Sequence, residues 1–311
     1  MIKLFTAFAG YGTDNFALKQ LEIPYALVGF SEIDKFAIKC FQQNHGGKNY
    51  GDISKIDWKE VPDFDLITGG FPCQDVSNAG KQDLNKGRTI LGLELTKALQ
   101  IKQPKYFLFE NVKGLMSKKF EDFRKQLVKS WEDSGYKVYY EILNTKDYGI
   151  PHSRSRIFFV GIRKDIEQDF KFPEKEELKV FFKDILIDLP FRDIPPFQSG
   201  KYGEKNRMDC LKCVDDLYFH TMTINRTHAN QYILNSDKTK CRLFNKKESF
   251  RLQGFLKDEI NLDGFSDNQA HRLAGNGQSL NVVSKIFSEL LKAMEVKQEA
   301  MQSEARHSSQ A

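Results

Sequence analysis

Residues 65–74 read Asp-Leu-Ile-Thr-Gly-Gly-Phe-Pro-Cys-Gln, and the rest of the chain is organised around them. The apolar start predicts a short strand. The Gly-Gly-Phe-Pro that follows cannot continue as a helix, because proline lacks an amide hydrogen and restricts the residue before it. The strand should therefore end in a sharp turn that presents Cys73 at its carboxyl edge. Ligands bind at that edge in open α/β sheets, although a lone cysteine is more often a small buried apolar residue.

Length and composition are those of a globular protein. The chain has 311 residues, 40% hydrophobic and 29% charged, enough for one large domain or two unequal ones. No apolar run approaches the ~20 residues that span a bilayer. The N-terminal residues 1–5 enter a strand directly and lack the zones of a signal peptide. We therefore expect a cytoplasmic protein with no membrane partner, and the net charge of +5 permits a polyanionic partner without requiring one.

The five cysteines are an odd number spread over a long chain, which argues against a disulfide framework. Cys210 and Cys213 form one CxxC pair, but no second pair with zinc-ligand spacing follows. His220 and Cys241 lie nearby at irregular spacing. We favour ordinary thiols over a zinc site and predict no metal.

A glycine-rich turn near the N-terminus predicts a nucleoside site. Residues 2–8 are expected to form a strand, and the turn at 10–12 leads into a helix, where glycine lets the backbone approach a ligand. Glu32 stands 20 residues after the second glycine, where a Rossmann-like fold places the acid that binds ribose hydroxyls. Asn15 occupies the position at which a dinucleotide fingerprint needs glycine or alanine. A cofactor without phosphates, such as S-adenosylmethionine, is therefore favoured over a dinucleotide, and a turn that binds no ligand is the plainer alternative.

Two later strands predict further reactive groups. The continuous apolar run 106–109 is typical of a buried parallel strand and ends at Glu110, a carboxylate that is costly to bury unless it is paired or functional. Cys73 and Glu110 would then face one cleft. Arg154 and Arg156 stand two apart at the start of another strand and should point to the same side. They would form a fork suited to a carbonyl or phosphate oxygen, the alternative being two surface arginines.

The remaining segments divide the chain into regions. The polar stretch 75–92 beside Cys73 is typical of a mobile lid, or else of a solvated connection. Over 166–248 the apolar periodicity weakens, and basic, amide and aromatic side chains of the kind that contact phosphates and base edges become frequent. An amphipathic helix over 280–294 should pack on the main sheet. The expected regions are a catalytic and cofactor-binding domain (1–165), a small target-recognition domain (166–250), a return to the catalytic domain (251–295) and a disordered tail (296–311).

Six motifs, in this order, resemble those of DNA (cytosine-5) methyltransferases. The resemblance runs from residue 4 to about residue 290 and implies an α/β fold. That fold is a Rossmann-like S-adenosylmethionine-dependent methyltransferase sheet with helices on both faces, plus a small irregular target-recognition domain. The motifs are Phe8-Ala9-Gly10-Tyr11-Gly12, Gly70-Phe71-Pro72-Cys73-Gln74, Glu110-Asn111-Val112, His152-Ser153-Arg154-Ser155-Arg156, Arg251-Leu252-Gln253-Gly254-Phe255 and Gly275-Asn276.

The resemblance also implies a mechanism. Cys73, as thiolate, would attack carbon 6 of cytosine, and Glu110 would hold or protonate ring nitrogen 3. Arg156, with Arg154 behind it, would bind the base carbonyl. Carbon 5 would take the methyl group of S-adenosylmethionine, leaving S-adenosylhomocysteine. A stacked base cannot react in this way, so the cytosine must be flipped out of duplex DNA.

The resemblance assigns further residues to the cofactor and to DNA. Phe8 would stack on the adenine, and Glu32 would bind the ribose. The full set of expected cofactor contacts is Phe8, Gly10, Tyr11, Gly12, Glu32, Ile33, Asp52, Ile53, Gly70, Pro72 and Asn276. DNA contacts are expected from Gln74, Ser77, Lys81, Arg88, Arg226 and Arg242.

Several positions depart from the family pattern without removing the nucleophile, the acid or the arginine. Thr6 stands where an aspartate is frequent and Thr13 where a glycine is frequent. His152 replaces a glutamine, and Gly277-Gln278 replaces Ser-Val or Ala-Val.

Three other functions are weaker fits. A tRNA (cytosine-5) methyltransferase would carry a Cys-Phe-Thr motif, whereas residues 221–224 read Thr-Met-Thr-Ile. A catalytically silent nucleic-acid-binding regulator would not need the three reactive groups, and a nicotinamide dehydrogenase would need the missing fingerprint. We therefore expect a monomer that acts on double-stranded DNA, and any cognate restriction endonuclease would work without physical contact.

Overall fold

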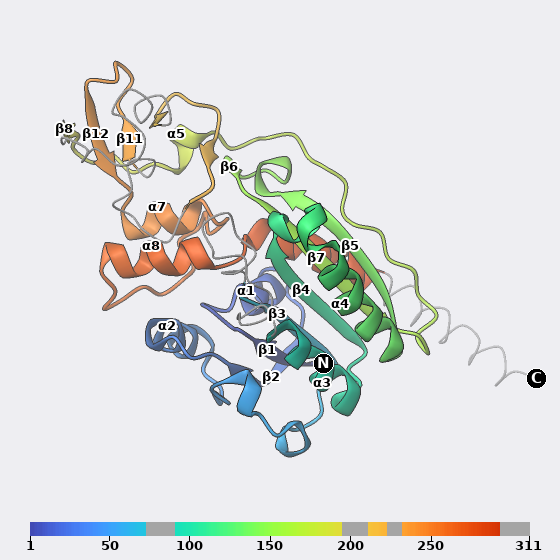
Figure 1. Ribbon diagram of the computed structural model, residues 1–311. Helices are drawn as coiled ribbons and strands as arrows, with labels where there is room; N and C mark the ends of the chain where they lie inside the picture. The colour runs from blue at the N-terminus through green and yellow to red at the C-terminus, as the bar shows by residue number, and fades with distance from the viewer. Residues whose placement is uncertain (73–90, 195–210, 223–231, 293–311) are drawn as a thin grey trace, which may run out of the picture.

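The computed structural model describes residues 1–72, 91–194, 211–222 and 232–292. Its centre is a six-stranded sheet in the order β2-β1-β3-β4-β7-β5 (Figure 1). The first four strands of the chain run parallel, and β7 lies antiparallel between β4 and β5. The strands are β1 (Ile2–Ala7), β2 (Tyr25–Ser31), β3 (Leu66–Gly70), β4 (Tyr106–Val112), β5 (Tyr136–Asn144) and β7 (Ser155–Arg163).

Both faces of this sheet are covered, because alternate residues of each strand point to opposite sides. Leu4, Leu108 and Val160 belong to one buried cluster, and their neighbours Phe5 and Phe107 belong to the other. Helices α3 (Leu91–Lys102) and α4 (Glu121–Asp133) cover the second face. Helix α1 (Thr13–Gln20) and the helical residues 280–292 cover the first, and α2 (Lys35–His45) lies beside β2 (Figure 1).

Short 3-10 turns complete the helical elements of the catalytic part. They are η1 (Ile53–Lys55), η2 (Trp58–Glu60), η4 (Lys113–Met116), η5 (Lys118–Phe120) and η6 (Thr145–Asp147).

The carboxyl ends of β1, β3 and β4 meet at one edge of the sheet. In the parallel register Ala7 is opposite Gly69, and Gly70 is opposite Glu110. A Cβ at Gly69 would lie 2.3 Å from the carbonyl oxygen of Ala7, so only glycine fits this close approach. Gly69 and Gly70, the last residues of β3, therefore let the neighbouring strand ends approach closely.

A second, smaller sheet lies away from the first, with α7 (Lys246–Arg251) and α8 (Asp267–Asn276) between the two (Figure 1). Its order is β8-β12-β11-β9, so this region is less irregular than the sequence predicted. The bounds are β8 (Arg192–Asp193), β9 (Lys212–Cys213), β11 (Tyr232–Leu234), β12 (Lys240–Leu243) and, for the helix before them, α5 (Phe182–Ile185).

A two-residue parallel pair connects the small region to the segment that precedes β7 of the main sheet. Strand β10 (Phe219–His220) pairs with β6 (His152–Ser153), immediately before the arginine motif. The α/β class, the helices on both faces and the strand positions agree with the expectation. Among the residues described, no helix is long and apolar enough to cross a membrane.

Candidate active site

Glu110 lies at the carboxyl edge of the sheet and is nearly enclosed. It is the fifth residue of β4, 8% exposed, and by alternation it points to the same face as Leu108. A Cβ at Gly70 would lie 2.9 Å from its Oε2 atom, so the glycine leaves room for the carboxylate. Burial raises the pKa of Glu110, while the charges of Arg156 and Arg154 lower it. The carboxyl group is therefore easier to protonate than an exposed glutamate.

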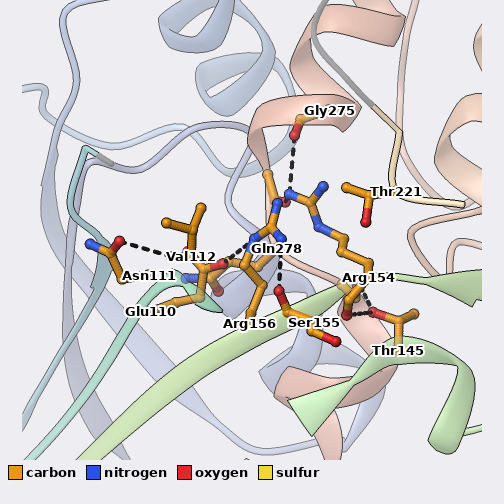
Figure 2. Close-up of polar contacts among 12 residues, drawn as sticks. Glu110, Asn111, Val112, Thr145, Arg154, Ser155, Arg156, Thr221, Gly275 and Gln278 are labelled. Carbon is orange, nitrogen blue, oxygen red and sulfur yellow. Dashed lines mark hydrogen bonds and ion pairs between the residues drawn. The ribbon is translucent and has the colours of Figure 1, made fainter. Parts of the chain in front are cut away.

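Arg156 approaches Glu110 from the neighbouring strand. It is opposite Val112 in the antiparallel register, two residues along from Glu110 and on the same face. The Nε atom of Arg156 is 3.1 Å from Oε1 of Glu110 (Figure 2). This ion pair lacks hydrogen-bond geometry, and Glu110 Oε1 accepts no hydrogen bond from the described residues. The pair can therefore still bind a ligand through the carboxylate.

Arg154 does not form a fork with Arg156, which corrects the sequence-based prediction. Its guanidinium is buried, and Nη2 donates to the carbonyl oxygens of Gly275 at 3.0 Å and Gly277 at 2.7 Å (Figure 2). A weaker contact of 3.5 Å joins Nη1 to the carbonyl of Met222. Arg154 thus joins the residue before β7 to the end of α8.

The predicted nucleophile, Cys73, lies outside the described residues, as do Gln74, Ser77, Lys81 and Arg88 of the predicted loop. The backbone that leads to Cys73 is described as far as Pro72. Asn111 Nδ2 donates to the carbonyl oxygen of Phe71 at 3.1 Å, and its Oδ1 accepts from the amide of Val112. The residue that follows Glu110 therefore holds the start of the cysteine turn beside that carboxylate. The sequence analysis named Asn111 only as part of a motif. A polar side chain on a strand predicted to be buried was the feature that could have indicated its role.

The glycine turn after β1 has the shape expected of a ligand-binding loop. Phe8, Gly10 and Gly12 all have positive φ, at 48°, 55° and 83°. A Cβ at Gly10 would meet nothing within 4 Å, so the turn borders open space. Glu32 accepts from the amide of Gly10 at 2.9 Å. The predicted ribose acid and the predicted glycine turn are therefore joined directly.

The predicted adenine side of the site is partly supported. Ile33 is 69% exposed, unusual for an isoleucine at a strand end, and offers an apolar surface beside Glu32. Asp52 is partly exposed and caps η1 through the amide of Ser54. Asn276, the last residue of α8, is exposed.

The side chains of two predicted cofactor residues face elsewhere. Tyr11 is 1% exposed, packs on Phe250 and Phe255, and donates its hydroxyl to the carbonyl of Gln278. Ile53 is buried in the apolar cluster beneath the sheet. Both side chains are large and apolar enough to be buried in the core. Their positions in the motifs did not show which way the side chains would point.

His45, which the sequence analysis did not single out, contacts the backbone of the glycine turn. His45, at the end of α2, lies with Nε2 3.2 Å from the carbonyl of Tyr11 and Nδ1 3.1 Å from Lys19 Nζ. Burial and the Lys19 charge lower the pKa of His45 to about 3. The ring is therefore neutral, with Nε2–H as the donor to the turn.

Asp14 is a second buried acid that the sequence did not single out. It lies in the first turn of α1 and is 3% exposed. Burial, together with the nearby Glu110 charge, raises its pKa to about 7. An acid in a first helical turn is normally an exposed partner of the helix dipole, so its sequence position gave no signal of burial.

Arg242 does not fit its predicted role as a DNA contact. It is 8% exposed, and both its terminal nitrogens donate to the Glu248 carboxylate, at 2.9 and 2.7 Å. Nη2 also donates to the carbonyl of Ile187 at 3.0 Å. This bidentate pair joins the small sheet to α7, and charge alone could not distinguish it from a surface arginine. Arg226 lies outside the described residues.

Comparisons with known proteins point to one family. The C-5 cytosine-specific DNA methylase family matches residues 2–193. The type II methyltransferase M1.ScrFI of Lactococcus lactis subsp. cremoris is 33% identical over 94% of this chain and 79% of its own length. The orphan methyltransferase M.SPRI of Bacillus phage SPR is 35% identical over 76% of this chain. The chain spans only 53% of M.SPRI, and 37% of the related M.Rho11sI of Bacillus phage rho11s.

Solved structures share the fold at lower identity. The Dnmt2 methyltransferase of S. pombe has a TM-score of 0.71 at 23% identity, covering 94% of this chain and 99% of that one. The Entamoeba histolytica methyltransferase EhMeth has a TM-score of 0.75 at 18% identity, with coverage of 94% and 99%. The strand that carries Glu110 and the strand that carries Arg156 both lie within the matched family region. The chain belongs to the C-5 cytosine-specific DNA methylase family.

Proposed function

We propose that this chain is a DNA (cytosine-5) methyltransferase that acts, as a monomer, on a cytosine flipped out of double-stranded DNA. The observation that carries the proposal is the enclosed Glu110–Arg156 pair at the carboxyl edge of the sheet, next to the strand that leads to Cys73. A carboxyl group with a raised pKa and a cation beside it are what protonation of a ring nitrogen and binding of a ring carbonyl require.

In the proposed reaction the Cys73 thiolate adds to carbon 6 of the base. Glu110 gives a proton to ring nitrogen 3, so that negative charge does not accumulate on the ring. Arg156 binds the base carbonyl and orients the ring. Carbon 5, now nucleophilic, accepts a methyl group. Carbon 5 then loses its proton to water and the thiolate leaves, which restores the aromatic ring, and nitrogen 3 returns its proton to Glu110.

S-adenosylmethionine would supply an electrophilic methyl group when bound. The residues of this chain fit it: Gly10 borders open space, Glu32 is held at the turn, and Ile33 presents an exposed apolar surface. Phe8 and Ile33 would contact the adenine, and Glu32 would bind the ribose hydroxyls. Asp52 and Asn276 would border the cofactor on either side.

Target recognition is proposed for the small region, residues 166–250. Specificity is carried by side chains at base edges, whereas phosphate contacts mainly position the protein. The four-stranded sheet would present loops to the duplex, and residues 75–92 would close over the flipped base. Any cognate endonuclease would read the same sequence independently.

Conversion sequencing of host DNA tests this function. The chain is expressed in a strain that lacks cytosine methylation, with Cys73→Ala alongside, and cofactor binding of both purified proteins is measured by calorimetry. We expect methylcytosine in one short sequence motif with the parent chain and none with Cys73→Ala, while both bind S-adenosylmethionine equally. Unmethylated DNA from a soluble chain that binds cofactor would contradict the proposal, and methylated tRNA in that strain would identify RNA as the substrate.

A further inference from the structure

Gln278 stands where the family pattern has valine, and its backbone is firmly fixed. The residue is 8% exposed and follows the end of α8. Its carbonyl oxygen accepts the hydroxyl of Tyr11 at 2.6 Å and that of Thr13 at 3.5 Å. These hydrogen bonds hold the backbone of residue 278 beside the glycine turn. The side chain at this position therefore decides which group borders Glu110.

The carboxamide of Gln278 borders the same small space as Glu110. A Cβ placed on Gly70 would lie 2.9 Å from Glu110 Oε2 and 3.5 Å from Gln278 Nε2. Gln278 Oε1 is buried and accepts no hydrogen bond from any described residue. Figure 2 shows this side chain among the residues around Glu110. A buried amide oxygen without a partner is costly, so its retention at this place calls for a partner.

The donor end of the Gln278 amide is the end that borders Glu110. An amide NH₂ donates to a carboxylate, and it cannot accept the proton of a carboxylic acid. The valine of the family pattern cannot donate.

We propose that Gln278 is a positioning residue whose Nε2 amide group donates a hydrogen bond to the Oε2 side of Glu110 and holds this carboxyl group in place. Arg156 faces Oε1, so Glu110 is held from two sides. The inference rests on the proposed function, because it assigns to Glu110 the proton that ring nitrogen 3 receives.

The direction of the effect follows from the charges around Glu110. The charged or titratable groups that act on it or respond to it are Arg156 from β7, Arg154 just before β7, Asp14 from α1 and Tyr11 from the glycine turn. Gln278 adds a neutral donor, which favours the carboxylate over the acid. Loss of the amide should therefore raise the pKa of Glu110 further.

Two variants separate hydrogen bonding from packing. Gln278→Val restores the residue of the family pattern, and Gln278→Met keeps the length of the side chain without its amide. In single-turnover methylation, the alkaline limb due to Glu110 should move to higher pH by about one unit in both variants. An unchanged limb in both variants would overturn the proposal, and so would a shift in Gln278→Val alone, because packing would then explain it.

A readout without activity separates this inference from the function. Difference infrared spectra against Glu110→Gln identify the Glu110 carboxyl band, and its titration midpoint is compared in parent, Gln278→Val and Gln278→Met. We expect the midpoint to rise by about one unit in both variants, whether or not DNA is methylated. Equal midpoints would overturn the role of Gln278 and leave the proposed function standing. A chain that fails to methylate DNA but shows the shift would contradict the function alone.

Discussion

The guanidinium of Arg154 donates to the carbonyl oxygen of Gly277 at 2.7 Å, although the two residues are 123 positions apart in the chain. This contact joins the segment before β7 to the C-terminal part of the chain, at the end of α8. It also fixes the backbone immediately before Gln278. A motif arginine that was expected to contact the substrate therefore donates to the backbone of a distant segment.

Arg154→Ala should destabilise the fold more than Arg156→Ala does. Removing the buried guanidinium leaves the carbonyls of Gly275 and Gly277 without donors, and hydrogen bonds to a charged group contribute roughly 1.5–3 kcal/mol each. We expect a loss of about 3 kcal/mol in the free energy of unfolding, measured by urea titration. Arg156→Ala should lose less than half as much, yet abolish methylation. Equal stability losses in the two variants would show that Arg154 is not the structural member of the pair.

His152 should be replaceable by glutamine but not by leucine. The ring is fully buried, its Nδ1 lies 2.9 Å from the carbonyl of Leu252, and its Nε2 accepts the amide of Met222 at 3.1 Å. Burial and the neighbouring Arg154 charge hold the pKa of His152 well below its usual range, so the ring stays neutral. A glutamine amide can likewise donate to one backbone group and accept from the other.

His152→Gln should unfold within about 1 kcal/mol of the parent and keep its activity. His152→Leu should lose about 2–4 kcal/mol, because it leaves a buried amide and a buried carbonyl unpaired. Circular dichroism during urea titration, with single-turnover methylation, measures both. Equal losses for the two variants would mean that the ring contributes through its shape and not through its hydrogen bonds.

The elements that the sequence predicted well are those with strong local signals. The apolar runs before Glu110 and before Gly69 left few alternatives, and both form strands where expected. The faces of single side chains were harder to predict. Tyr11 lies in a motif that was expected to border the cofactor but points into the core, because 267 residues later the chain returns to accept its hydroxyl.

Charged side chains show the same limit. Arg154, Arg156 and Arg242 look alike in sequence, yet one donates to backbone carbonyls, one pairs with an active-site acid and one joins two parts of the fold. The partners of Arg154 and Arg156 are distant in sequence. Arg242 pairs with Glu248, only six residues away, but burial and not spacing makes that pair structural. Burial depends on the whole fold, so no local pattern reports it.

Asp14 should make stability depend on pH in a way that Asp14→Asn removes. Its pKa rises from 3.8 to about 7 on folding, chiefly through burial. A raised folded pKa favours the native state fully below the unfolded value of 3.8, and this contribution is lost as pH rises through about 7. Between pH 4 and pH 8 the parent should lose up to about 4 kcal/mol more than Asp14→Asn.

Urea midpoints of both proteins at pH 4, 6 and 8 measure this difference, because contributions common to both, such as that of His45, cancel. Curves for the parent and Asp14→Asn that stay parallel across the range would show that the aspartate ionises as freely in the folded chain as in the unfolded one. A pH-dependent gap would establish a second buried acid beside Glu110.

Arg242 and Arg226 provide a matched test of which arginines face DNA. Arg242→Gln leaves Glu248 buried without its cation, so the free energy of unfolding should fall by about 3–5 kcal/mol. Affinity for a cytosine-containing duplex is measured by fluorescence anisotropy between 50 and 200 mM salt. Under conditions in which Arg242→Gln is folded, the slope of its log affinity against log salt concentration should equal that of the parent. Arg226→Gln, which removes an arginine predicted to contact DNA, should have little effect on stability and should reduce the magnitude of the salt slope by about one. The reverse pattern, a reduced slope for Arg242→Gln with its stability intact, would mean that the Arg242–Glu248 pair opens to bind DNA.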